Sequence, residues 1–217
     1  MEKLIDASLK AAGSLFAPGM FGVLIKSLII TIVALTLFFF GASSFFFWLF
    51  GADSPWSWLG AFGSGMMAWF LFPPIMPIIV NFFDTRIVRI IEMQHYPSAP
   101  LATEPPFMKE FLHDLGFTSK ALLLNLLALP LYLIPVVNLL LFYGLNGYLL
   151  GREFFVMVAR QHMPLEEAIA LHKRHRRMAS VAGTLLAFTA TLPIINLFAP
   201  IWGIALMVHV YHRINKS

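Results

Sequence analysis

Residues 121–151 read ALLLNLLALPLYLIPVVNLLLFYGLNGYLLG, and residues 178–211 read MASVAGTLLAFTATLPIINLFAPIWGIALMVHVY. Neither stretch contains Asp, Glu, Lys or Arg, and the same pattern interrupts both near the middle. Pro135-Val136-Val137-Asn138-Leu139 matches Pro193-Ile194-Ile195-Asn196-Leu197, which lies 58 residues later. Proline fixes φ and lacks an N–H, so it suits a tight turn or the first position of a helix. The repeat predicts two helical hairpins with tips at Pro135, Asn138, Pro193 and Asn196.

The arms of these hairpins are short. Each has about 11–17 residues and would extend about 17–25 Å as an α-helix, whereas the hydrocarbon core of a bilayer is about 30 Å thick. We therefore expect both hairpins to enter the membrane only partway. The alternatives are two kinked single crossings and a chance match of five residues.

Two other charge-free stretches, residues 27–52 and 54–83, precede the hairpins. Residues 28–50 contain no proline and would extend roughly 35 Å as a helix, enough for a tilted crossing. The second stretch is also long enough, although three prolines are expected to kink or interrupt it: Pro73, Pro74 and Pro77. Three tryptophans surround the connection, where an aromatic belt would mark the membrane interface: Trp48, Trp56 and Trp58. Residues 27–83 therefore predict a transmembrane hairpin.

Composition places the chain in lipid. Of its 217 residues 59% are hydrophobic and 12% charged, whereas soluble domains are about half apolar and a quarter charged. The fold class predicted is an all-α integral membrane protein with an N-terminal amphipathic helix, two transmembrane helices and two half-inserted, proline-broken helical hairpins. We expect one membrane domain over 1–217, with an interfacial helix at 1–19, the transmembrane hairpin at 27–83, cytosolic-side helices and a loop at 84–120, the first re-entrant hairpin at 121–151, a polar helical linker at 152–177 and the second re-entrant hairpin at 178–211.

The basic residues support re-entrant hairpins. The connection between the first two apolar stretches has one charged residue, Asp53, and no basic residue. Residues 152–177, in contrast, contain six basic residues: Arg152, Arg160, Lys173, Arg174, Arg176 and Arg177. Hairpins return both of their ends to one side of the membrane, as the positive-inside rule favours. The net charge is +4, and the basic residues that produce it flank apolar runs. They therefore indicate membrane topology and contact with lipid headgroups rather than nucleic-acid binding.

Signals for catalysis and for metal binding are weak. The chain has no cysteine, which excludes disulfides and thiolate chemistry, and it lacks the common nucleophile, phosphate-loop and zinc-protease motifs. His172 and His175 are spaced as metal ligands can be, but the cations around them favour a solvated basic face. We therefore expect no enzyme activity, no cofactor and no metal site.

Arginines offer the best candidates for anion binding. Arg86 and Arg89 lie three residues apart on one face of a predicted helix, and guanidinium groups suit oxyanions. An ion-pair face or a headgroup anchor is the alternative. Arg152 is a third candidate, with a snorkelling anchor as its alternative. Asn138 and Asn196 either cap the hairpin tips or line a polar path.

The run Gly147-Tyr148-Leu149-Leu150-Gly151-Arg152-Glu153 resembles the CysZ family, which includes bacterial sulfate permeases and the eukaryotic etoposide-induced membrane proteins. The Pro-apolar-apolar-Asn breaks, the amphipathic start and residues 82–92 are similar to it as well. The resemblance implies two transmembrane helices, two half-inserted hairpins and a homo-oligomer whose protomers take opposite orientations. It also implies Gly19 and Met20 as anion-binding positions, because the permeases carry Gly-Leu-Arg after an early proline. Here Pro18 is followed by Gly19-Met20-Phe21, so the arginine is missing.

The function expected from this resemblance is channel-like transport of sulfate, or of a related small anion, across the bacterial cytoplasmic membrane for sulfur assimilation and cysteine synthesis. The partners expected are the anion, membrane lipid and further copies of the chain. The first alternative is a membrane scaffold or interaction protein that does not transport. A membrane-embedded enzyme comes third.

Overall fold

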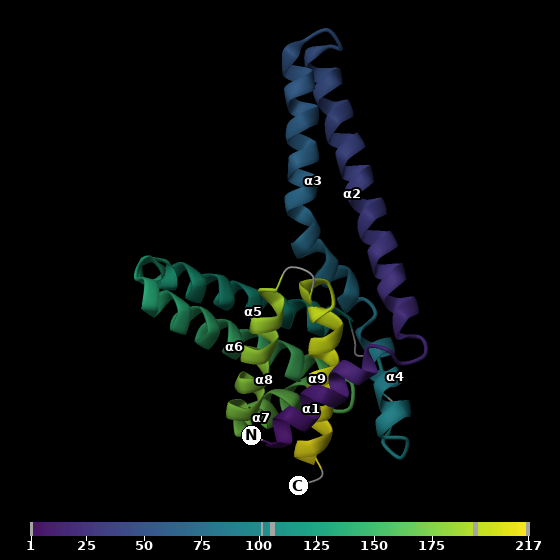
Figure 1. Cartoon of the computed structure of the whole chain (residues 1–217), viewed down its shortest axis with the longest axis vertical. Coiled ribbons are helices and arrows are strands. Elements are labelled where there is room, and N and C mark those ends of the chain that lie inside the picture. The colour runs from purple at the N-terminus through teal and green to yellow at the C-terminus, as the bar shows by residue number, and fades with distance from the viewer. Residues whose placement is uncertain (1, 101, 105–106, 193–194, 216–217) are drawn as a thin grey trace. The chain divides into compact units, whose positions relative to one another are not determined.

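The structure is a computed structural model and describes residues 2–100, 102–104, 107–192 and 195–215. All regular secondary structure within these ranges is helical, which confirms the predicted all-α class. The described residues form two compact units, one of residues 19–83 and one of residues 1–18 with 84–217. We describe each unit by itself (Figure 1).

The unit of residues 19–83 is a pair of long helices. Helix α2 spans Met20–Phe50 and α3 spans Pro55–Asn81, and the chain reverses between them at Gly51, whose φ is 79°. The side chains of Ser43 and Ser64 form a buried hydrogen bond of 2.9 Å between the helices. A Cβ at Gly60 would overlap the ring of Phe46, so the small residue allows this close packing.

Among the described helices, α2 alone has both the length and the apolar composition expected of a membrane span. Helix α3 has 27 residues without a charged side chain, and its backbone stays helical through residues 73–77, so the expected interruption does not occur. Both helices present large apolar side chains outward, including Leu37, Trp48, Trp58, Trp69 and Phe70. The second crossing and the two half-insertions stay predictions.

The other unit contains the remaining helices. They are α1 (Glu2–Ser14), α4 (Asp84–His95), α5 (Phe107–Ala128), the 3-10 turn η1 (Leu129–Leu133), α6 (Pro135–Ala159), α7 (Leu165–Arg174), α8 (Arg176–Ala190), the 3-10 turn η2 (Ile195–Leu197) and α9 (Ala199–Asn215). Helix α9 lies at the centre, since Ile201, Ile204, Leu206, Met207 and Val208 are all fully buried. Helices α1, α4, α6 and α8 pack against it.

Glycines let α6 and α8 cross at very short distance. A Cβ at Gly151 would overlap the carbonyl of Ala179, and one at Gly147 would overlap the hydroxyl of Thr184. From the other side, a Cβ at Gly183 would meet the backbone of Gly147 and Gly151. Small residues four apart allow such backbone contact between helices in membranes.

The same backbone hydrogen bond occurs at both proline breaks. The backbone N–H of Asn138 donates to the carbonyl of Ile134 at 2.7 Å, and that of Asn196 donates to Leu192 at 2.7 Å. Both bonds therefore span the proline position of the repeat. Helix α6 begins directly at Pro135, whereas on the other side of the second break the 3-10 turn η2 precedes α9. Pro193 itself lies outside the described residues.

The hairpin arms differ from the expected lengths in one hairpin. Helices α8 and α9 have 15 and 17 residues, but α5 and α6 have 22 and 25 because their helices continue into charged sequence beyond the apolar arms. Residues 107–120, expected among the cytosolic-side helices, are thus the beginning of α5. Figure 1 shows the chain turning back between α5 and α6.

Helix α1 has two different faces. Ala7, Ala11 and Ser14 are buried, and α1 packs against α9. Ile5 and Leu9 on the other face are 58% and 69% exposed, and Phe16, which follows the helix, is 89% exposed. An apolar face left open beside a small-residue contact face is what an interfacial helix requires.

Candidate functional site

Arg86 and Arg89 both lie on the exposed side of α4, opposite the buried residues Ile87, Val88 and Ile91. The Nε of Arg89 donates a hydrogen bond of 2.7 Å to the carbonyl of Ala102. Arg89 therefore holds the segment after α4 in place. Both guanidinium groups remain at the surface, where an anion can reach them.

Arg152 lies on a different element from these two arginines. It is half-buried on α6, and its guanidinium carbon lies 3.8 Å from the centre of the Phe117 ring on α5. Such cation–π contact ties α6 to α5 and is typical of arginine. Arg86 and Arg89 thus share one face, and Arg152 is engaged elsewhere in the same unit.

Gly19 and Met20 belong to the other unit, at the start of α2. Gly19 has a φ of 90° and precedes the helix, and its carbonyl accepts from the N–H of Val23 at 3.3 Å. This left-handed backbone favours glycine, since other residues clash there. The next N–H groups open a helix of 31 residues, and the N-terminal end of a helix favours anions.

Asn138 and Asn196, the two tip asparagines, have half-buried side chains. What the structure shows at both tips is the bond of the backbone N–H described above, so the turn itself is stabilised by main-chain atoms. The proposed role of the asparagine side chains in a polar path stays a prediction.

Sequence reasoning missed a compact set of polar groups, which we call the Glu92 cluster and define as Glu92, His162 and His212. Glu92 is on α4, His162 follows α6 and His212 is near the end of α9. The Nε2 atoms of His162 and His212 lie 2.8 Å and 2.7 Å from the same Glu92 oxygen, Oε1. Glu92 is only 2% exposed. The cluster therefore joins three elements at a buried point.

Burial and the two neighbouring imidazoles act on the Glu92 carboxyl in opposite directions. Burial alone would raise the pKa of Glu92, but the adjacent imidazoles of His162 and His212 outweigh that effect and hold the pKa below its ordinary value. The carboxylate form is therefore the stable one, although it is removed from water.

Aromatic rings surround the two histidines. The ring of His162 stacks on Tyr211 with centres 5.0 Å apart, and the ring of His212 stacks on Tyr96 at 4.1 Å. The hydroxyl of Tyr96 lies 2.8 Å from Nδ1 of His209. These contacts fix the direction of both imidazoles.

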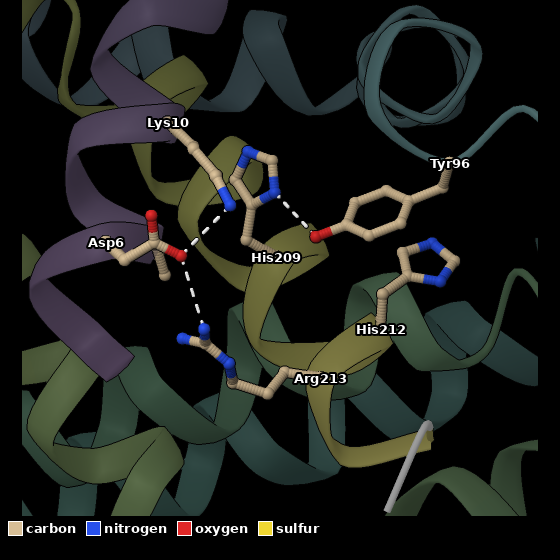
Figure 2. A pocket seen from close by; sticks show the side chains of 7 residues that line it. Asp6, Lys10, Tyr96, His209, His212 and Arg213 are labelled. Carbon is tan, nitrogen blue, oxygen red and sulfur yellow. Dashed lines mark hydrogen bonds and ion pairs between the residues drawn. The ribbon is translucent and has the colours of Figure 1, made fainter. Parts of the chain in front are cut away.

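A cavity of about 350 Å³ lies beside one member of the cluster, His212. Helix α1 lines it with Asp6, Ala7 and Lys10, and α9 lines it with His209, His212 and Arg213, while Tyr96 closes one side (Figure 2). Asp6 pairs with Lys10 at 3.0 Å and with Arg213 at 3.2 Å. His212 thus belongs both to the cavity wall and to the Glu92 cluster.

A family model described as sulfate transporter CysZ/etoposide-induced protein 2.4 matches residues 7–200. The chain belongs to this family. No curated protein matches the chain. The family is a membrane transporter family, which agrees with the apolar helix α2.

The motif of residues 147–153, which resembles the CysZ/etoposide-induced family, has a structural role. Gly147 and Gly151 of that motif are the residues that let α6 approach α8, as described above. His212 lies beyond the last residue that the family model matches. The family match therefore carries no information on the complete Glu92 cluster.

One prediction about this family member was wrong. His172 was expected on a solvated basic face, but it is 3% exposed and packs near the rings of Tyr148 and Phe155. Its neighbours Lys173, Arg174, Arg176 and Arg177 are exposed, as expected. Burial, together with the nearby charges of Arg152 and Arg176, lowers the pKa of His172 to about 4.

Proposed function

We propose that the protein carries sulfate, or a related small anion, across the bacterial cytoplasmic membrane by a channel-like route that feeds sulfur assimilation. The observation that carries this proposal is the family match over residues 7–200. The apolar, charge-free helices α2 and α3 support a multi-pass membrane location.

The chemistry of the proposed path rests on helix ends and guanidinium groups. The turn at Gly19 offers the first N–H groups of α2, and Arg86 and Arg89 offer charged donors on the open side of α4. Hydrogen bonds to charged groups contribute about 1.5–3 kcal/mol each. No covalent step is needed, because the anion only exchanges water for these donors.

A path through several protomers would agree with the extent of exposed apolar surface. We propose a homo-oligomer in membrane lipid, with protomers in opposite orientations. The large exposed side chains on α2, α3 and α6 would then contact lipid or another copy.

The test is the uptake of radiolabelled sulfate into liposomes that contain the purified protein. We expect saturable uptake above that of empty liposomes, and a decrease of about tenfold or more in Arg86→Ala, because one charge-assisted contact is worth more than 1.4 kcal/mol. Arg89→Ala should also transport less, but its loss frees the Ala102 carbonyl, so its helicity must be checked. Arg174→Ala, an exposed cation on α7, is the matched control and should transport normally.

A second uptake experiment restores the arginine that is missing after Gly19. Phe21 occupies the position where the family permeases carry arginine, and its side chain is 69% exposed. We expect Phe21→Arg to lower the sulfate concentration needed for half-maximal uptake. Competition by other oxyanions would then identify the anion that the natural chain prefers.

The alternative, a membrane scaffold without transport, is favoured by one observation, the absence of that arginine after Gly19. Wild-type protein that is folded but gives no uptake of any oxyanion would refute the permease proposal. It would leave the scaffold as the better description.

A further inference from the structure

We propose that the Glu92 cluster is a binding site for a divalent transition-metal ion of the Zn²⁺ type. The proposal does not depend on anion transport. It is based on the ligand set, on unpaired polar atoms, on the fixed rings and on the cavity beside His212.

The ligand set has the right chemistry. Glu92, His162 and His212 each offer one ligand atom, and these three atoms all lie within 4.8 Å of one another. Two imidazoles and one carboxylate form a common zinc ligand set, in which a water molecule takes the fourth position. Zinc bonds of about 2.0–2.2 Å place neighbouring ligand atoms somewhat over 3 Å apart. The present separations of 2.7 and 2.8 Å need only a small opening of the side chains to admit the ion.

The polar atoms of the cluster are not paired as a pure hydrogen-bond network would pair them. Both histidines approach the same oxygen of Glu92, and among the described residues the other oxygen, Oε2, has no hydrogen-bond partner although it is buried. Nε2 of His162 lies at 2.8 Å but lacks the alignment of a hydrogen bond. A half-satisfied buried network is costly, and an ion between these atoms would satisfy it.

The neighbourhood has spare polar capacity as well. Gln161, next to His162, is 1% exposed, and within the described part of the chain neither atom of its amide has a partner. Buried amides of this kind are normally satisfied by water or by a polar ligand.

The rings are held in place before any ion arrives. Tyr211 stacks on His162 and Tyr96 stacks on His212, so both Nε2 atoms already face the carboxylate. His212 also lines the cavity described above, so an ion would approach the cluster from the side of His212. A fixed ligand set and an approach for the ion are what a metal site requires.

The ion would tie α4, the turn after α6 and α9 to one point. Helix α1 packs against α9, and it also contacts the end of α4 through the bond of 3.1 Å between Ser14 Oγ and His95 Nε2. The site would therefore stabilise the unit around α9. Metal binding to the folded state alone raises the apparent melting temperature.

The experiment uses the full chain in detergent, with any affinity tag removed and bound metal stripped by a chelator. Zn²⁺ is titrated by calorimetry, and the metal that remains after dialysis is measured by mass spectrometry. We expect one Zn²⁺ per chain and a rise in melting temperature. Co²⁺ in its place should give the intense visible absorption of a tetrahedral site.

Glu92→Gln and His212→Gln should each lower the affinity for Zn²⁺ by more than about 100-fold, which exceeds the loss caused by removal of a neighbour that only supports a ligand. His175→Gln, at the start of α8 and outside the cluster, is the matched control and should bind Zn²⁺ as the wild type does. Binding that survives in both cluster variants would overturn the proposal.

Two measurements on the wild type keep the test decisive even if a variant misfolds. X-ray absorption of the zinc-loaded protein should show two imidazoles in the coordination shell. Zinc without imidazole ligands, or no stoichiometric zinc on folded wild-type protein, would show that the cluster is a hydrogen-bond network only.

Discussion

His172 shows how one residue is placed by its helix rather than by its sequence neighbours. The run from His172 to Arg177 is strongly basic, which predicted a solvated face. On α7, however, Ala168 and His172 are four residues apart and therefore share the buried side. Tyr148, Phe155 and the charge of Arg152 then surround the imidazole and keep it neutral.

This burial predicts a dependence of stability on pH. The pKa of histidine is about 6.5 in an unfolded chain, whereas that of His172 in the folded protein is about 4. Between these values the unfolded state binds the additional proton, so the free energy of unfolding decreases as the pH falls from about 6.5 toward 4. Above about 6.5 the contribution is constant. The measurement is the melting temperature in detergent across this range.

The matched variants for this prediction are His172→Gln and His175→Gln. The first should have a lower stability at neutral pH, because packing is lost, but a flatter pH profile. The second should retain the slope of the wild type. Parallel slopes for all three proteins would show that His172 is not the group responsible.

The Glu92 cluster shows what single-sequence reasoning cannot reach at the residue scale. Its three members come from α4, the turn after α6 and α9, so no short spacing connects them along the chain. Residues such as His172 and His175 attract attention because they are only three positions apart in the sequence. Only the packing of α4 and α6 against α9 brings Glu92 to its two histidines.

At the scale of elements, the sequence located the break at Pro135, whereas the backbone of α3 stays helical at Pro73, Pro74 and Pro77. A missing N–H and a fixed φ act locally, so Pro135 determines where α6 begins, and both tips repeat the same backbone hydrogen bond. The position of a helix end is harder to predict, because polar and charged residues can continue a helix beyond its apolar part. Charged sequence therefore extended α5 and α6 beyond the apolar arms that we used to predict their length.

The crossing of α6 and α8 carries the prediction that belongs to this scale. Gly151→Ala places a methyl group against the carbonyl of Ala179, and overpacking of this kind costs about 1–3 kcal/mol. Gly144→Ala on the same helix meets nothing within 4 Å, so the gain in helix propensity should stabilise the protein by about 0.5–1 kcal/mol. The melting temperatures of the two variants should therefore shift in opposite directions.

Sulfate uptake by the same two variants separates packing from chemistry. Neither glycine is among the proposed anion ligands, so any loss in Gly151→Ala should follow its loss of folded protein. If Gly151→Ala is as stable as Gly144→Ala, then the close contact between α6 and α8 is not what the glycine provides.

For the whole molecule, composition predicted an integral membrane protein because the chain has more apolar side chains than its own core can bury. Many large apolar side chains are mostly exposed: Phe40 (61%), Trp69 (80%), Leu122 (70%), Leu133 (85%) and Leu140 (72%). Such surface needs lipid or another copy of the chain. How deeply each hairpin enters the bilayer depends on that lipid, and neither helix length nor sequence repeat determines it.

Re-entrant insertion can be tested directly, because the chain has no cysteine. Val137→Cys and Ile195→Cys place single thiols near the two tips, where the native side chains are 36% and 47% exposed. Lys173→Cys on the exposed side of α7 marks the water-facing end. If both hairpins end inside the bilayer, a membrane-impermeant maleimide labels Lys173→Cys but neither tip, from either side of sealed vesicles. This holds for protomers of both orientations, since a tip in the hydrocarbon is shielded in each. Free labelling of Val137→Cys or Ile195→Cys would instead show that the tip is not shielded by hydrocarbon, and it would contradict half-insertion.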